Sequence, residues 1–239
     1  MMALIAATLI AAPRQEAGKI AYRVLSSGGH RYHVVQADTT EGFVATRTVL
    51  RHGRVSPWQF VKRERPKVMM TGTFFAMQNG TPVADVLIDG ILQARGNRGS
   101  AFGVRPDGTI ALWDKPFCRK EDWSGYAYGL RGAVRVVTKG KVHPNPKAQR
   151  FKDPAIWGIA ARTAVGVTKA GKLLLVATKE RVTLSSLGKA MVKAGAIDGV
   201  ALDGGGSACL YVDGKMVVPT SRPLSNMLVL SESAVALRQ

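Results

Sequence analysis

The segment LLLVATKERVTLSSLGKAMVKAGAIDGVALDGGGS (residues 173–207) decides the predicted fold, because its hydrophobic period changes twice. It opens with an apolar run typical of a strand and ends in a second such run, GVALD. Between the two runs lies a predicted helix with Thr183 as its N-cap and Gly195 as its stop. Four apolar residues share one face of this helix: Leu184, Leu187, Met191 and Ala194. The strand–helix–strand order predicts two strands that run parallel if they share a sheet.

Short apolar runs along the rest of the chain predict further strands. They lie at residues 32–35, 83–88, 101–104, 134–137, 164–167 and 173–177. Glycine-containing pairs predict the hairpin turns, because glycine adopts a positive φ without steric cost: Asp89-Gly90, Asp107-Gly108, Lys139-Gly140, Ala170-Gly171 and Asp213-Gly214. We therefore expect an α+β fold, with a mixed, largely antiparallel β-sheet and a few packed helices in a single domain.

The N-terminus is predicted to lie outside this domain. Residues 3–12 are apolar but too few to span a bilayer, and no other run is long enough for a transmembrane anchor. We interpret residues 1–17 as a signal peptide or a disordered segment, and residues 18–239 as the domain. Export to the periplasm, cell envelope or medium of a bacterium is favoured over the cytoplasm. Cys118 and Cys209 either pair, as suits an exported protein, or remain unpaired.

The charge of the chain predicts an anionic partner. Thirty-four Lys and Arg residues face 16 Asp and Glu residues, which gives a formal net charge of +18. The basic residues are dispersed, aromatic residues make up only 7% of the chain, and no nucleic-acid-binding motif is present. A phosphate-bearing substrate or an anionic envelope polymer fits this charge as well as nucleic acid does.

The glycine run after GVALD is the first candidate site. Gly204, Gly205 and Gly206 at a strand end allow backbone amides to converge on an anion, and they allow a ligand to approach closely. Ser207 adds a hydroxyl donor, and Asp203 is a candidate acid, base, nucleophile or metal ligand. The alternative interpretation is a glycine turn that Asp203 merely caps.

Two further stretches carry candidate residues. In VMMTGTFFAMQNGTPV (residues 68–83), Phe74 and Phe75 point to opposite faces if the segment is extended, so that one packs in the core and the other lines a cleft. In ARTAVGV (residues 161–167), Arg162 offers a rigid fork of donors for a phosphate or carboxylate. The proline-rich residues 144–154 form a surface loop or a flap over a site. The chain lacks HExxH, P-loop, GxGxxG and GxSxG motifs; no metal site is identified, and a divalent cation remains an open option.

Taken in order, TGTFF, ARTAVGVTKAGKLLLVAT, the block from TLSSLGKAM to DGGGSACLYV, and RPLSNMLVL resemble the phosphodiester glycosidase family. The resemblance covers roughly residues 30–232. It implies hydrolysis of the glycosidic C–O bond of a sugar-1-phosphodiester. It also implies that one pocket gathers the following residues: Thr71, Gly72, Phe74, Phe75, Arg162, Thr163, Asp203, Gly204, Gly205, Gly206, Ser207, Arg222 and Asn226. Family members usually carry Asn at the position of Thr71 and a small hydroxyl residue at that of Cys209.

These observations predict an outline mechanism. Asp203 lies on the sugar side as a base or electrostatic stabiliser, while Arg162 and the amides of residues 204–206 hold the phosphate. Asp85, Asp89 and Asp198 are unranked candidates for a second carboxylate. The alternatives are a non-catalytic module that binds phosphorylated cell-envelope glycans and, from charge alone, a nucleic-acid-binding protein.

Overall fold

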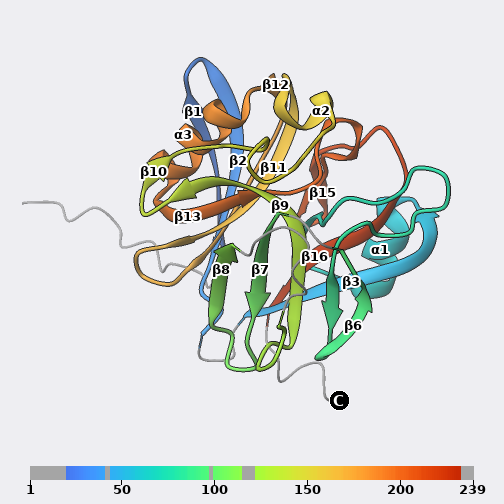
Figure 1. Cartoon of the computed structure of the whole chain (residues 1–239). Helices are drawn as coiled ribbons and strands as arrows, with labels where there is room; N and C mark the ends of the chain where they lie inside the picture. The colour runs from blue at the N-terminus through green and yellow to red at the C-terminus, as the bar shows by residue number, and fades with distance from the viewer. Residues whose placement is uncertain (1–19, 41–43, 97–98, 115–121, 233–239) are drawn as a thin grey trace, which may run out of the picture.

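The computed structural model describes residues 20–40, 44–96, 99–114 and 122–232. Its strands form two antiparallel sheets (Figure 1). The larger sheet has eleven strands, and its main path follows the order β1-β2-β12-β11-β13-β9-β5-β6. The strands on this path are β1 (Ile20–Ser27), β2 (His30–Ala37), β12 (Leu173–Val182), β11 (Ala160–Thr168), β13 (Ala196–Ala201), β9 (Tyr128–Thr138), β5 (Val86–Ile88) and β6 (Ile91–Ala94).

Three more strands belong to the larger sheet: β7 (Ser100–Val104) and β10 (Lys141–Val142) pair with β9, and β8 (Ile110–Asp114) pairs with β7. The smaller sheet has the order β15-β14-β4-β16-β3. Its strands are β15 (Lys215–Val218), β14 (Leu210–Val212), β4 (Val68–Thr71), β16 (Leu224–Glu232) and β3 (Val44–Val55). Helices are few: α1 (Pro57–Glu64), α2 (Pro154–Trp157), α3 (Leu184–Ala194) and the single 3-10 turn η1 (Gly205–Ser207) within the described ranges.

The predicted strand–helix–strand unit is confirmed as β12-α3-β13. Thr183 caps α3 by accepting a hydrogen bond from the Ser186 amide, and Gly195 ends it at φ 107°. Strands β12 and β13 run in the same direction, but β11 lies between them and is antiparallel to both. The expected mixed sheet is therefore corrected. Every strand pair in the described part of the chain is antiparallel, and β12 and β13 form no parallel pair because β11 lies between them.

The hairpin turns form where the sequence predicts them. At Asp89-Gly90, Lys139-Gly140 and Asp213-Gly214, both turn residues have positive φ. This is the type I′ geometry, which matches the right-handed twist of the flanking strands. These turns connect β5 to β6, β9 to β10 and β14 to β15.

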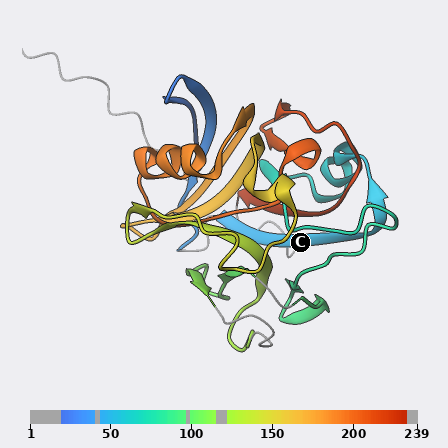
Figure 2. The same ribbon diagram turned by 45° about the horizontal axis from the view of Figure 1, so that its top comes forward.

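Hydrophobic side chains divide the molecule into layers. A central core between the sheets joins residues such as Val35 and Leu175 of the larger sheet to Met70 and Leu228 of the smaller one. The outer face of the larger sheet packs against α3, and that of the smaller sheet packs against α1 through Phe60. The two helices therefore lie on opposite sides of the paired sheets (Figure 2). Strands dominate so strongly that α+β describes the fold only loosely.

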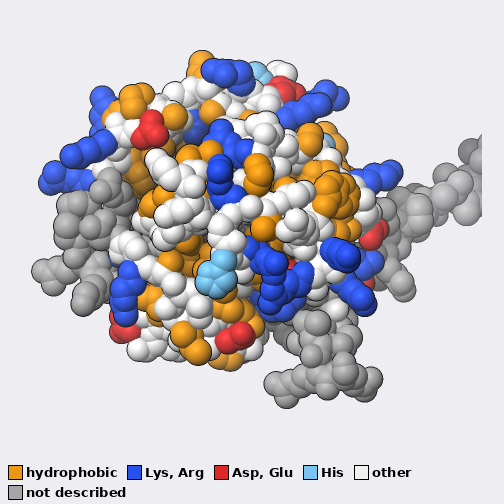
Figure 3. All heavy atoms as spheres, turned by 90° about the vertical axis from the view of Figure 1, so that its right-hand side faces the viewer, with side chains coloured by type: hydrophobic (Ala, Val, Ile, Leu, Met, Phe, Trp, Pro, Cys, Tyr) orange, Lys and Arg blue, Asp and Glu red, His pale blue; other side chains and the backbone are white. Residues whose placement is uncertain are grey.

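The surface carries the excess of basic residues. Figure 3 shows Lys and Arg side chains spread over one face, with few Asp and Glu among them. None of the helices in the described ranges has the length and apolar character required to cross a membrane. Residues 1–17 and Cys118 lie outside the described residues, while Cys209 is buried as a free thiol.

Candidate active site

A cavity of about 650 Å³ opens where the glycine run, the segment after β4 and the segment before β11 meet. Nineteen residues line it, and nine of them are predicted site residues: Phe74, Phe75, Arg162, Asp203, Gly204, Gly205, Gly206, Ser207 and Arg222. The fold thus gathers most of the candidate set around one space, although its members come from distant parts of the chain.

Asp203 lies at the junction of the two sheets. It follows β13 of the larger sheet, and its amide donates a hydrogen bond to the carbonyl of Gly72, which follows β4 of the smaller sheet (3.1 Å). Thr163 Oγ1 on β11 donates to the Asp203 carbonyl (2.8 Å). Three strand ends therefore fix the backbone of Asp203, and its side chain faces the cavity from a rigid position.

The glycine run continues from Asp203 as a tight turn. Gly205 has φ +58°, a left-handed conformation that favours glycine. The Ser207 amide donates to the Gly204 carbonyl (3.0 Å), while the amides of Gly205 and Gly206 donate no hydrogen bond to any described residue. The Gly206 carbonyl accepts from Thr220 Oγ1 (2.6 Å). This turn is held in place and keeps two amide donors available at the cavity.

Burial and hydrogen bonding act on the Asp203 carboxyl in opposite directions. The net effect raises its pKa from 3.8 to about 6, and the largest cause is burial, which disfavours the charged form. The Ser207 hydroxyl and the Gly204 amide, which lies 2.9 Å from Oδ1, donate to the carboxylate and lower the pKa, as does the positive charge of Arg222. The result is a carboxyl that titrates close to neutral pH, as groups that transfer protons in enzymes often do.

Arg162 brings a buried positive charge to the cavity. It is only 5% exposed, and its Nη2 and Nε donate to the carbonyls of Gly158 and Val182. Burial lowers its pKa, and within the described ranges it forms no ion pair with a carboxylate. A buried guanidinium that is bonded only to carbonyls is costly unless an anion joins it. The cavity wall is thus prepared for an anionic ligand.

Arg222 supplies a second cation at the glycine turn. Its guanidinium packs so closely on Gly206 that an added Cβ there would displace Nη2. Its Nη1 lies 3.2 Å from Met77 Sδ. With Lys152, three basic side chains line the cavity against two acidic ones, Asp153 and Asp203. The cavity therefore has a net positive charge when all five groups are ionised.

The two phenylalanines enter different hydrophobic clusters, as alternation along an extended segment predicts. Phe75 packs with Phe60 and the smaller sheet, whereas Phe74 packs toward the α3 side and lies 5.9 Å from Phe151, ring centre to ring centre. Both rings also border the cavity, so the expectation that only one would do so is corrected.

Four predicted site residues do not line the cavity: Thr71, Gly72, Thr163 and Asn226. They lie one layer behind it and hold its walls. Thr71 Oγ1 donates to the Ser207 carbonyl (2.5 Å) at the far end of the glycine turn. A Cβ at Gly72 would collide with Asn226 Oδ1. Threonine in place of the usual family asparagine therefore secures the turn by its hydroxyl.

Asn226 fixes the segment that carries the phenylalanines. Its Oδ1 accepts from the Thr73 amide (2.7 Å) and its Nδ2 donates to the Thr73 carbonyl (3.0 Å). Asn226 is 1% exposed, so water cannot replace it as the hydrogen-bond partner of the Thr73 amide and carbonyl. We assign it a positioning role.

Replacing Asn226 by alanine should lower the free energy of unfolding by about 2–4 kcal/mol, because two buried backbone groups lose their partners. Urea unfolding measures the change. Asn79→Ala is the matched control, because Asn79 Oδ1 accepts a backbone hydrogen bond from Thr81 (2.9 Å) on the exposed surface. We expect a loss below about 1 kcal/mol for the control. Equal losses in the two variants would contradict the positioning role.

The three candidates for a second carboxylate lie elsewhere, which corrects that expectation. Asp85 is buried and accepts from Trp123 Nε1 (2.9 Å), and Asp89 accepts from the Tyr128 hydroxyl at a hairpin. Asp198 lies 3.5 Å from Arg135 Nη1. None of the three lines the cavity. Aspartates in strands and turns look alike in sequence, and only the tertiary pairing separates structural from cavity positions.

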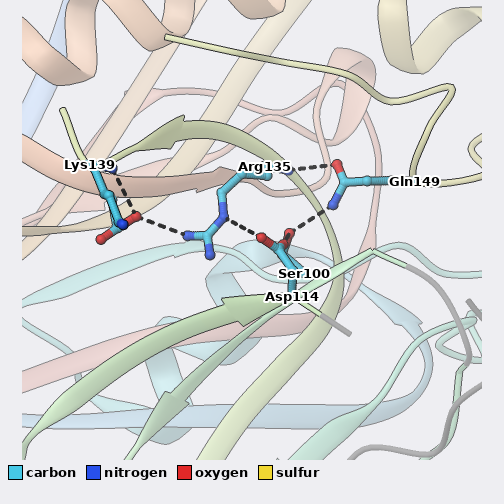
Figure 4. Close-up of polar contacts among 6 residues, drawn as sticks. Ser100, Asp114, Arg135, Lys139 and Gln149 are labelled. Carbon is cyan, nitrogen blue, oxygen red and sulfur yellow. Dashed lines mark hydrogen bonds and ion pairs between the residues drawn. The ribbon is translucent and has the colours of Figure 1, made fainter. Parts of the chain in front are cut away.

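A polar network around Arg135 anchors one wall of the cavity (Figure 4). Arg135 Nε contacts Asp114 (3.2 Å), and the Arg135 amide donates to Gln149 Oε1 (2.9 Å). Gln149 Nε2 donates to Ser100 Oγ (2.8 Å), and this hydroxyl donates to Asp114. The network ties the proline-rich segment to β7, β8 and β9. Phe151, which follows directly, is thereby held at the cavity.

The proline-rich segment therefore forms part of the cavity wall through residues 151–153, a role that differs from both the surface loop and the flap that the sequence predicts. It also contributes Asp153, which sequence reasoning missed. Asp153 caps α2 by accepting from the Ala155 amide (2.8 Å). Asp followed by Pro is a helix-start signal that could have identified α2, but the place of Asp153 in the lining of the same cavity as Asp203 depends on tertiary structure. Among the described residues, no group of three or more His, Cys, Asp or Glu side chains could hold a metal ion.

Comparison with known proteins places this site in a family. A family model described as phosphodiester glycosidase matches residues 65–231, which is more than half of the chain. The bovine N-acetylglucosamine-1-phosphodiester alpha-N-acetylglucosaminidase is 28% identical over 180 residues, and the human enzyme is 26% identical over 181. Each alignment covers 67% of this chain, which spans about a third of the length of these relatives (34% and 35%).

Solved structures share the fold. The catalytic domain of zebrafish N-acetylglucosamine-1-phosphodiester alpha-N-acetylglucosaminidase, auto-inhibited by its pro-peptide, matches with a TM-score of 0.72 at 19% identity, over 89% of this chain and 82% of that one. A hypothetical protein from Synechocystis matches with a TM-score of 0.77 at 13% identity, over 89% and 62%. With the family match over residues 65–231, the gathering of the four motifs around one cavity leads to a single conclusion: the chain belongs to the phosphodiester glycosidase family.

Proposed function

We propose that this protein is a hydrolase that cleaves the glycosidic bond of a sugar-1-phosphodiester. The observation that carries the proposal is the pairing, in one cavity, of a carboxyl whose pKa is about 6 with two arginines and unused backbone amides. Such a substrate has a sugar carbon that becomes positive and a phosphate that stays negative. The cavity offers a carboxylate to the positive sugar carbon, and arginines and amides to the negative phosphate.

In this proposal, Asp203 acts at the sugar. A water molecule forms the new C–O bond at the anomeric carbon, and its proton passes to the Asp203 carboxylate and then to solvent. The old bond breaks between the anomeric carbon and the bridging oxygen, which keeps the electron pair. The products are a free sugar and a phosphomonoester. The carboxylate also stabilises the positive charge that develops on the sugar ring.

Arg162, Arg222 and the amides of Gly205 and Gly206 act at the phosphate. Their donors neutralise the charge that accumulates on the departing phosphomonoester, and they lie in a cavity where electrostatic interactions are stronger than in bulk water. Because phosphate departs as an anion, the step needs no strong general acid. Asp153 already caps α2, and we assign it to that structural role.

The test is to incubate the purified protein with a methyl ester of N-acetylglucosamine-1-phosphate and to measure the free sugar across pH 4–9. Asp203 must be ionised to accept a proton, so kcat/KM should be constant above about pH 7 and fall below pH 6, approaching a tenfold loss per pH unit. Binding without turnover across a panel of sugar phosphodiesters would refute the proposal and favour a glycan-binding module. Activity that is lost above pH 6 instead would refute the role of Asp203 as a base.

The cellular setting that we propose is outside the cytoplasm. The apolar residues 3–12 support export, and a dispersed net charge of +18 suits a protein that meets anionic envelope polymers.

A further inference from the structure

The cavity is divided into a polar part and an apolar part. The polar part comes from the loop after β13, from Arg162 and Arg222, and from Lys152 and Asp153 at the start of α2. The apolar part comes from the segment after β4 and from the segment around α2, and nine apolar side chains compose it: Phe74, Phe75, Met77, Val83, Ala84, Phe151, Ala155, Ile156 and Ala160. Apolar side chains thus outnumber the six polar or charged ones in the lining. This surface is larger than a phosphate and its counter-charges require.

Contact between the two parts occurs at Arg222. Its Nη1 lies 3.2 Å from Met77 Sδ, while the rest of its guanidinium packs on Gly206 of the turn that bears Asp203. Arg222 therefore contacts both the turn that bears Asp203 and, at Met77, the apolar lining of the cavity. In a sugar-1-phosphodiester the sugar and the second alcohol are bonded to the phosphorus through different oxygens. With the sugar at Asp203, the second alcohol extends past Met77.

The rim beyond Met77 exposes apolar surface to water. Val83 is 54% exposed and Met77 is 42% exposed. Contiguous exposed apolar side chains around a cavity favour an apolar ligand, since covering them removes apolar area from water. A hydroxyl-rich alcohol would lose hydrogen bonds to water there and find few replacements.

From this division, and resting on the proposed function, we propose that the second alcohol of the substrate is apolar. The substrate class is then a sugar-1-phosphodiester of a long alkyl or prenyl-type alcohol, and the apolar part of the cavity is the subsite for that chain. Met77 and Val83 are its specificity-determining residues, and Arg222 marks the boundary between the subsites.

Two measurements test the proposal separately from the proposed function. The first is the binding of methyl, heptyl and 3,6-dioxaheptyl phosphate by calorimetry, which requires no turnover. The last two ligands have the same length, but one carries ether oxygens. Heptyl phosphate should bind at least about tenfold more tightly than methyl phosphate, since several methylenes leave water. The dioxaheptyl ester should bind as weakly as the methyl ester. The second measurement is kcat/KM for the corresponding esters of N-acetylglucosamine-1-phosphate, with the same order expected.

Variants locate the subsite. In Met77→Gln with Val83→Thr, the ratio of heptyl to methyl affinity should fall toward one. Ile91→Thr is the matched control, because Ile91 is 65% exposed and lies outside the cavity lining, and this variant should keep the ratio of the unmodified protein. Equal affinity for heptyl and dioxaheptyl phosphate, or no affinity for either, would overturn the inference. A heptyl preference without hydrolysis of any ester would overturn the proposed function and leave the subsite standing.

Discussion

Asp203→Asn should lower kcat for release of free sugar by about 10²–10⁴-fold, the range that a positioned acid–base group supplies. The amide keeps the size of the side chain, and its oxygen can still accept from the Gly204 amide. It cannot accept a proton from water, and it carries no charge to stabilise the sugar. The assay is single-substrate kinetics at pH 8, where Asp203 is ionised in the unmodified protein.

The same substitution should make the protein more stable at pH 8, which separates loss of chemistry from loss of fold. The folded-state pKa of about 6 lies above the unfolded value of 3.8, so the fold favours the protonated carboxyl. The stability that this preference provides is fully present below pH 3.8 and is lost as the pH rises through 6. At pH 8 the ionised carboxylate therefore costs up to about 3 kcal/mol, and the amide should recover about 1–3 kcal/mol of it.

Asp213→Asn is the matched control for both effects. Asp213 lies at an exposed hairpin turn with φ 41°, a conformation that asparagine also tolerates. This variant should retain full activity and change stability by less than about 0.5 kcal/mol. A protein in which Asp203→Asn turned over substrate at an unchanged rate would require a different catalytic carboxylate.

Arg162→Met should lower kcat/KM by about 10²-fold, because charge-assisted hydrogen bonds to the phosphate are lost. Methionine retains much of the packing of the arginine stem. Inorganic phosphate should inhibit the unmodified protein by competition, and the variant should lose most of this inhibition. Since the guanidinium is buried among carbonyls without an acidic partner, its removal should leave the melting temperature unchanged or raise it.

Arg181→Met controls for the loss of one positive charge from a protein with a net charge of +18. Arg181 lies on β12 and is exposed, so Arg181→Met removes the same charge from the protein as Arg162→Met does and leaves the cavity untouched. If Arg181→Met weakened phosphate inhibition as much as Arg162→Met, the binding site for the anion would lie outside the cavity.

The parts of the fold that follow from local rules could be predicted from the sequence. The α3 helix needed only the spacing of Leu184, Leu187 and Met191 and its two caps, all within one segment. The type I′ hairpins needed only a local Asp-Gly or Lys-Gly pair, in which both residues have positive φ. The smaller sheet was not predictable in this way. Its strand β16 pairs with β3 and β4 across more than 150 residues of chain, and no local pattern specifies such a register.

The same distinction between local sequence and tertiary contacts applies to the site. Sequence order and family resemblance identified Asp203, Arg162 and the glycines, which the structure brings to one cavity. Asn226 and Thr71 were expected at the substrate, yet their side chains bond to backbone one layer behind. An alignment of motifs does not distinguish a residue that touches a ligand from one that holds its neighbour. The sequence left the place of the segment around Phe151 open, because that place depends on Gln149, whose partners lie on β7 and β9.

The hydrogen bond from the Asp203 amide to the Gly72 carbonyl has a consequence for the order of folding. It joins two sheets whose strands meet only after long loops have closed. The entropy cost of closing these loops is therefore incurred before the contacts between the sheets stabilise the chain. A chain in which each sheet has formed separately would hold most of its strand hydrogen bonds, yet the central core would be open and Asp203 would lack its partner at Gly72. Recovery of enzymatic turnover during refolding therefore reports the docking of one sheet on the other, an event to which circular dichroism of either sheet alone is insensitive.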